Sequence, residues 1–222
     1  MGLFIIVPYA VSKQRPFLES AFISYSTVLE QVRAASEQSK VVVAIIGARE
    51  PSGGSTVDEE DALNVLKDIS THYPIDSKNI YLYGVCEGGR NALLLAEHHP
   101  GIFAAVGAWG PTLAASRDGS DDPVMLAQKI SKTPLVLFKG NFDYELPNQA
   151  LLAFGRILKS LGNLDVTLQI VPNAMHDPIR MEGVIFPLLA RYQKDALGRS
   201  VDNRATASPT GGGVQESARV TN

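Results

Sequence analysis

Cysteine is almost absent from this chain, because Cys86 is the only one among 222 residues. A single thiol excludes an intrachain disulfide and is typical of a reducing compartment. Long apolar runs are missing too: the apolar start, residues 3–7, is too short to span a membrane and lacks the basic flank of a signal peptide. Ile6 stands where a myristoylation motif needs Ser or Thr. These absences predict a cytoplasmic protein with no membrane partner, or a secreted one if an N-terminal segment has been removed.

Clusters of basic residues are also scarce. The chain has 20 Lys and Arg against 23 Asp and Glu, for a net charge of −3, which argues against nucleic acid as a partner. Charged residues make up 19% and hydrophobic residues 45%, a normal globular balance. The length suits one α/β domain with a sizeable core. We expect no organic cofactor and no metal ion.

Short apolar runs alternate with stretches of helical periodicity along the chain. The runs expected as strands are residues 3–7, 41–46, 80–83, 103–108, 133–139 and 164–171. Helices are expected at 17–36, from the capping box that begins at 56, and at 90–97, 125–130, 149–161 and 184–192. This alternation predicts an α/β fold, a three-layer αβα sandwich with a mostly parallel central sheet. Residues 198–222, rich in Ser, Thr, Ala and Gly without amphipathic period, are expected to form a flexible tail after a domain at 1–197.

The most informative motif surrounds the single cysteine. Positions 84–89 read G-V-C-E-G-G between a predicted strand and a predicted helix. A nucleophile on a sharp strand-to-helix turn, with glycines two residues away on either side, is typical of a nucleophile elbow, since strand and helix pass too closely there for a Cβ. The backbone N–H of Glu87 would then point at a developing oxyanion. The alternative is that Cys86 is a small buried apolar residue at a strand end.

An acid candidate follows the predicted strand 133–139. Asp143 lies just past its end, where a carboxylate can accept a hydrogen bond from an imidazole, fix its tautomer and stabilise the imidazolium. Alternatively, Asp143 is a turn residue that caps the helix beginning near Pro147. Glu145 is a competing acid that lies further from the strand end.

A histidine candidate follows the last predicted strand, 164–171. Of the four histidines, only His176 comes after a strand that follows the acid. His98 and His99 end the helix after the elbow, where basic residues are ordinary surface chemistry, and His72 lies in a helix-to-strand connection. Since ligands bind beyond the carboxyl ends of parallel strands, we expect His176 to meet Cys86 and Asp143 there.

The residues around the elbow resemble the α/β-hydrolase superfamily. Segments 76–84 (DSKNIYLYG), 90–96 (RNALLLA) and 98–105 (HHPGIFAA) are similar to prolyl-oligopeptidase-like esterases and peptidases and to dienelactone hydrolases. The resemblance runs from about residue 3 to 192 and is specific in the elbow region. Such hydrolases order their triad as nucleophile, acid and histidine, which is the order of Cys86, Asp143 and His176. The resemblance implies an α/β-hydrolase fold.

Two features depart from that family. Most esterase and peptidase relatives carry serine at the position of Cys86, whereas dienelactone hydrolases carry cysteine in a similar elbow, so Cys86 is either natural or a substituted serine. The strand at 3–7 corresponds to the family's third, so the first two are expected to be missing. The loop after it reads Pro8-Tyr9-Ala10. The resemblance implies that the Glu87 N–H pairs with the N–H of Tyr9 or Ala10, or with the Tyr9 hydroxyl, in an oxyanion hole, while Tyr9 as an aromatic packed at a strand end is the alternative.

These residues predict a hydrolase of carboxylic esters, lactones or thioesters that acts on a small molecule through a Cys86–His176–Asp143 triad and an acyl-enzyme. Thiolates expel amines poorly, which favours esters over peptides. Trp109 follows a strand end and either lines the substrate pocket or is a rim aromatic from the core. The alternatives are a prolyl-oligopeptidase-like serine peptidase relative with Ser replaced by Cys, and a non-catalytic binding protein with the same fold.

Overall fold

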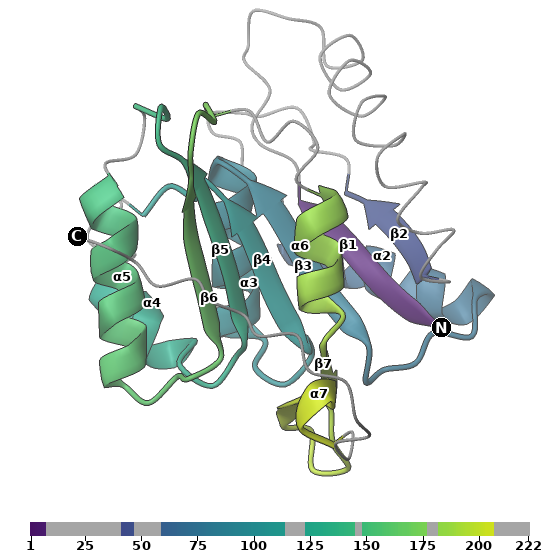
Figure 1. Cartoon of the computed structure of the whole chain (residues 1–222). Helices are drawn as coiled ribbons and strands as arrows, with labels where there is room; N and C mark the ends of the chain where they lie inside the picture. Colours follow the sequence, from purple (N-terminus) through teal and green to yellow (C-terminus); the bar gives the residue numbers. More distant parts are fainter. Residues whose placement is uncertain (8–40, 47–58, 114–122, 145–147, 177–181, 207–222) are drawn as a thin grey trace, which may run out of the picture.

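A computed structural model of the chain describes residues 1–7, 41–46, 59–113, 123–144, 148–176 and 182–206. In these residues six strands form one sheet in the order β2-β1-β3-β4-β5-β6, and every neighbouring pair is parallel (Figure 1). The strands are β1 (Gly2–Val7), β2 (Val41–Ile45), β3 (Ile80–Val85), β4 (Ala105–Trp109), β5 (Leu135–Gly140) and β6 (Val166–Val171). The predicted mostly parallel sheet is confirmed.

Helices cover both faces of this sheet. On one face lie α2 (Glu59–His72), α3 (Glu87–His98), α4 (Pro123–Lys129) and α5 (Asn148–Ser160), and on the other lies α6 (Glu182–Leu189) (Figure 1). Two clusters of buried side chains separate these layers. Leu82, Leu93 and Phe154 belong to the cluster beneath α2–α5, whereas Phe4 and Ile185 belong to the one beneath α6. The three-layer sandwich is therefore the fold of the chain.

The central strands are buried along almost their whole length because helices cover both of their faces. Every residue of β4 and β5 is buried, and so are five of the six residues of β1. Such continuous burial is expected of parallel strands between two helical layers, where alternating polar residues would have no access to water. The one charged side chain in β5, that of Lys139, is therefore an exception that needs a local partner.

Two details differ from the sequence-based expectations. The fourth strand begins at Ala105 and ends at Trp109, so Trp109 closes the strand instead of following it. Regular structure also continues past residue 197: β7 (Tyr192–Lys194) pairs antiparallel with β8 (Ser200–Asp202), and α7 (Asn203–Thr206) follows. The backbone N–H of Lys194 and its Nζ donate to carbonyl groups of Lys78, Gly101 and Ile102, which joins this hairpin to the domain.

Several predicted features lie outside the described residues. They include the helix at 17–36, the start of the capping box at 56, Glu145, and residues 207–222 of the predicted tail. No helix in the described parts of the chain is long and apolar enough to cross a membrane. Since all six strands of the sheet run the same way, their carboxyl ends share one edge, and residues that follow β3, β4, β5 and β6 meet there.

Candidate active site

Cys86 lies on a strained turn between β3 and α3. Its backbone has φ 55° and ψ −123°, in a region that residues with a side chain rarely adopt. Gly84 permits this turn, because a Cβ there would lie 2.2 Å from the carbonyl oxygen of Gly88. The close approach of β3 and α3 holds this strained backbone in place, and the thiol therefore lies at the sheet edge, ahead of the first turn of α3. The predicted elbow geometry is thus present in the structure.

His176 and Asp143 meet at the same edge from loops 33 residues apart. The Nδ1 atom of His176 lies 3.0 Å from Oδ2 of Asp143, and Asp143 is buried while the imidazole is 29% exposed. A carboxylate acceptor on Nδ1 places the ring proton there and leaves Nε2 directed away from the acid. Asp143 is therefore positioned as an imidazole partner and not only as a turn residue.

Cys86 is the other partner of His176. The hydrogen bond to Cys86, together with Asp143, raises the pKa of His176 from 6.5 to about 9, although burial opposes the shift. Because Nδ1 is engaged by Asp143, Nε2 is the ring nitrogen available to the sulfur. The three residues selected from the sequence are thus brought together as a chain of thiol, imidazole and carboxylate.

Residues at the end of β4 contact Cys86, Asp143 and His176. The backbone N–H of Cys86 donates to the carbonyl oxygen of Trp109 at 2.9 Å, and the indole N–H of Trp109 donates to the backbone carbonyl of His176 at 2.7 Å. Gly110, with φ +49°, packs so closely that an added Cβ would lie 2.9 Å from Oδ2 of Asp143. Trp109 is fully buried, and this positioning contact was not foreseen from the sequence. That it also lines a substrate pocket stays a prediction.

Glu87 follows the nucleophile directly and would oppose a thiolate. Its carboxylate accepts a hydrogen bond from Nη1 of Arg90 at 3.2 Å, one turn further along α3. Both side chains are partly buried, at 29% and 15% exposure for Glu87 and Arg90. The guanidinium therefore compensates the negative charge beside Cys86, a partner that the spacing of three residues in a helix could have indicated.

Lys139 is the second residue that the sequence analysis did not single out. Its fully buried Nζ lies 3.8 Å from Oδ2 of Asp143. A lysine as the penultimate residue of an otherwise apolar strand, T-P-L-V-L-F-K-G, was the available signal. The Asp143 carboxylate therefore lies close to two basic side chains, those of His176 and Lys139.

The remaining predicted site residues are only partly described. Glu87 begins α3, whose first-turn N–H groups have no acceptor within the helix. Tyr9 and Ala10, the other expected oxyanion donors, lie outside the described residues. His98 and His99 contact the Glu59 carboxylate, joining the end of α3 to the start of α2, and His72 contacts Asp68. Of the residues described, no group of three or more His, Cys, Asp or Glu is arranged to hold a metal ion.

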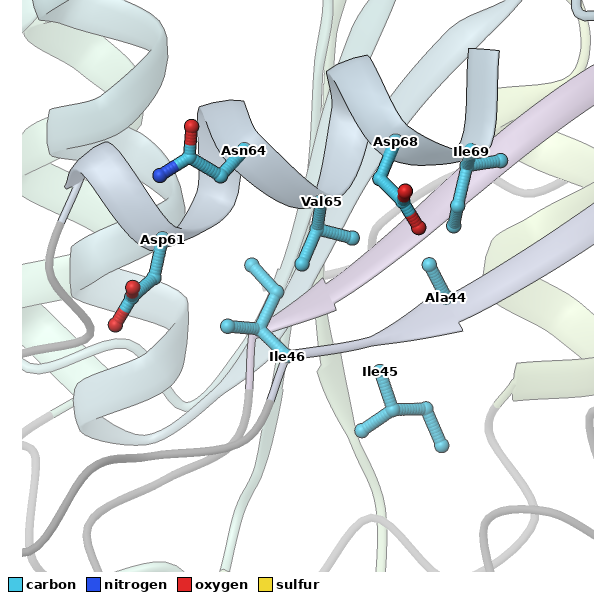
Figure 2. Close-up of a pocket in the computed structure, with 8 residues that line it drawn as sticks. All are labelled: Ala44, Ile45, Ile46, Asp61, Asn64, Val65, Asp68 and Ile69. Atoms are coloured by element: carbon cyan, nitrogen blue, oxygen red, sulfur yellow. The ribbon is translucent and has the colours of Figure 1, made fainter. Parts of the chain in front are cut away.

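A hollow of about 570 Å³ lies elsewhere, between α2 and the end of β2 (Figure 2). Figure 2 shows Asp61 and Asn64 on α2 beside Ile46, with Val65 directed at the strand. Its described lining residues are Ala44, Ile45, Ile46, Asp61, Asn64, Val65, Asp68 and Ile69. Cys86, Asp143 and His176 are not among these lining residues.

Comparison with protein families places the chain in one of them. The sequence model described as the dienelactone hydrolase family matches residues 33–197, which contain Cys86, Asp143 and His176. Comparison with curated proteins gave no match.

Solved structures share the fold at low sequence identity. An S-formylglutathione hydrolase from Agrobacterium tumefaciens is similar with a TM-score of 0.63 and 13% identity, over 85% of this chain and 83% of that one. A protein from Klebsiella pneumoniae, provisionally described as a dienelactone hydrolase, has a TM-score of 0.61 and 15% identity, over 85% of both chains. An acylaminoacyl peptidase from Pyrococcus horikoshii has a TM-score of 0.62 and 18% identity, over 87% of this chain but 38% of its own.

Proposed function

The chain belongs to the dienelactone hydrolase family, and we propose that it hydrolyses small carboxylic esters, lactones or thioesters with Cys86 as the nucleophile. A single observation carries this proposal: His176 contacts the Asp143 carboxylate through Nδ1 at 3.0 Å, while Cys86, on its other side, contributes most to raising the pKa of the imidazole. That arrangement gives the imidazole one fixed tautomer and a second nitrogen directed at the thiol, which is what a general base for a sulfur nucleophile requires.

Acylation uses the state in which the Cys86 proton is held on Nε2 of His176, a state that the raised pKa of the imidazole favours. The thiolate forms a bond from sulfur to the ester carbonyl carbon, and the carbonyl π electrons move onto its oxygen. Collapse of this oxyanion breaks the bond to the alcohol, which leaves with the proton from the imidazolium. The Asp143 carboxylate stabilises the imidazolium throughout without taking up a proton itself.

Deacylation repeats these steps with water in place of the alcohol. His176 removes a proton from a water molecule, whose oxygen attacks the carbonyl carbon of the thioester. The second oxyanion collapses, breaks the bond from carbon to sulfur and releases the carboxylic acid. The Cys86 sulfur leaves as a thiolate beside the imidazolium, so the enzyme returns to its starting state.

Backbone N–H groups would stabilise the oxyanion in both halves of the reaction. The Glu87 N–H lies at the start of α3, where the helix dipole favours negative charge and the donor has no acceptor within the helix. We propose Tyr9 or Ala10 as the source of the second donor. The ion pair from Arg90 to Glu87 supports the proposal, because it limits repulsion between the Glu87 carboxylate and the thiolate.

The proposal is tested by hydrolysis of p-nitrophenyl acetate and butyrate with wild-type protein, Cys86→Ala and Cys86→Ser. We expect turnover by the wild type that is lost in Cys86→Ala, because removal of the nucleophile abolishes the acyl-enzyme. A Cys86→Ser variant faster than the wild type would favour serine as the original nucleophile. Absence of both turnover and an acyl burst from wild type and Cys86→Ser would overturn the proposal in favour of a binding protein.

A further inference from the structure

Lys139 is a cation with no exposed surface, placed inside the turn that carries the acid of the site. Its Nζ donates to the carbonyl oxygen of Gly140 at 3.0 Å and to that of Asp143 at 2.5 Å. The Asp143 N–H also donates to the Gly140 carbonyl, at 3.2 Å. The lysine therefore holds the carbonyl groups at both ends of a four-residue turn.

The charge of Lys139 acts on the same carboxylate oxygen that His176 contacts. Oδ2 of Asp143 lies 3.8 Å from the lysine Nζ and 3.0 Å from Nδ1 of the imidazole. Transfer of a lysine side chain out of water is costly unless an anion compensates it. Burial lowers the pKa of Lys139 below its ordinary value, and the charge and hydrogen bond of the buried Asp143 offset part of that lowering.

We propose that Lys139 is a positioning residue of the active site, whose ammonium group clamps the Asp143 turn and shares the Asp143 carboxylate with His176. The inference rests on the proposed function in one respect, since Asp143 and His176 act as catalytic partners only if the site is catalytic. The effect of the Lys139 charge on the His176 titration does not depend on whether the protein hydrolyses an ester.

When two cations contact one carboxylate, each lowers the pKa of the other. An ammonium group beside Oδ2 repels the imidazolium and reduces the stabilisation that Asp143 gives it. The two nitrogens are at most about 7 Å apart, since both lie close to the same oxygen, and at that separation a buried unit charge shifts a neighbouring titration by about one to two pH units. Lys139 thus keeps His176 from binding its proton too tightly to release it to a leaving group.

The test compares a variant that loses both the charge and the hydrogen bonds of Lys139 with one that loses the charge but keeps a donor. Lys139→Met keeps an unbranched chain and removes both, whereas Lys139→Gln keeps an amide N–H donor and removes the charge alone. Protonation of His176 is followed by NMR of ¹³C-labelled histidine, with His176→Gln used to assign the resonance. We expect the His176 titration to move up by about one to two pH units in both variants, and the thermal stability lost in Lys139→Met to return in part in Lys139→Gln.

Lys129→Met is the matched control, because it removes one lysine charge from α4, where Lys129 is 55% exposed and pairs with Glu97 of α3. It should leave the His176 titration unchanged. Among the described residues, Cys86 is a further titratable group that faces His176, and it is unchanged in every variant of this series. Equal His176 titrations in wild type and Lys139→Gln would overturn the inference, and so would an equal shift in Lys129→Met.

The outcomes separate this inference from the proposed function. If the wild type shows no esterase turnover but the His176 titration rises in the Lys139 variants, the proposed function would be overturned and the electrostatic role of Lys139 would be kept. Esterase turnover by the wild type, with a His176 titration that does not change in the Lys139 variants, would keep the proposed function and overturn the role of Lys139. If neither lysine variant folds, ¹³C-labelled lysine in the wild type provides the test: the Lys139 resonance should have the position of an ammonium group at pH 7, and the position of a neutral amine would overturn the inference.

Discussion

The indole N–H of Trp109 donates to the backbone carbonyl oxygen of His176 at 2.7 Å. This hydrogen bond joins the end of β4 to the loop after β6, and the backbone carbonyl of Trp109 holds Cys86 from the same position. One residue therefore fixes the relative placement of the proposed nucleophile and the proposed base.

Removal of that hydrogen bond should reduce catalysis. A net hydrogen bond is worth about 0.5–1.5 kcal/mol, so Trp109→Phe is expected to lower kcat/KM for p-nitrophenyl acetate by about two- to twelvefold. Tyr81→Phe is the control, because it removes a buried hydrogen bond to the backbone carbonyl of Tyr192 away from the site. Equal losses of activity in the two variants would argue against a positioning role for Trp109.

The close packing of Gly110 against Asp143 gives a second prediction. Gly110→Ala should lose about 1–2 kcal/mol of stability from its positive φ, and the new Cβ should displace the carboxylate from His176. Misplacement of the acid is expected to reduce kcat/KM by about ten- to a hundredfold.

Gly162→Ala separates the two effects of the Gly110 substitution. Gly162 has φ +84°, and a Cβ added there would meet no atom within 4 Å, so this variant should lose stability without loss of activity. Urea unfolding and ester hydrolysis of both variants provide the comparison. A fully active Gly110→Ala would show that Asp143 tolerates the contact.

His176 should titrate far above an ordinary histidine. Its pKa of about 9 in the folded protein lies above the unfolded value of 6.5, so its contribution to stability is fully present below pH 6.5 and is lost as the pH rises through about 9. The hydrogen bond to Cys86 is the largest cause, so in Cys86→Ala the NMR titration of His176 should move down towards 6.5. An unchanged titration in that variant would assign the shift to Asp143 instead.

The ion pair beside the nucleophile can be tested through thiol reactivity. Arg90→Met leaves the Glu87 carboxylate without this guanidinium and should slow alkylation of Cys86 by iodoacetamide about two- to fivefold at pH 7. Glu87→Gln combined with Arg90→Met should restore the rate, because the repelling charge is gone. A double variant as slow as Arg90→Met would mean that Arg90 acts through packing and not through charge.

The sequence by itself determined the features that depend on neighbouring residues. The run from 80 to 89 encodes a strand, a turn that only glycine permits at 84, and a helix start, all of which are local consequences of residue type. Alternating strands and helices required a parallel sheet between helices, and the order along the chain selected Cys86, Asp143 and His176. Their convergence followed because residues after parallel strands share one edge.

Only the tertiary structure decided what surrounds these three residues. The register of β4 with β3 and β5, in which Trp109 lies opposite Val85 and Phe138, brings Gly110 against Asp143 and the Trp109 indole beneath the His176 loop. Lys139 was included in the predicted strand 133–139 without a role, and its partners became visible only with the Asp143 turn in place. Contacts between residues tens of positions apart depend on strand register and loop path, which no local pattern of residue types specifies.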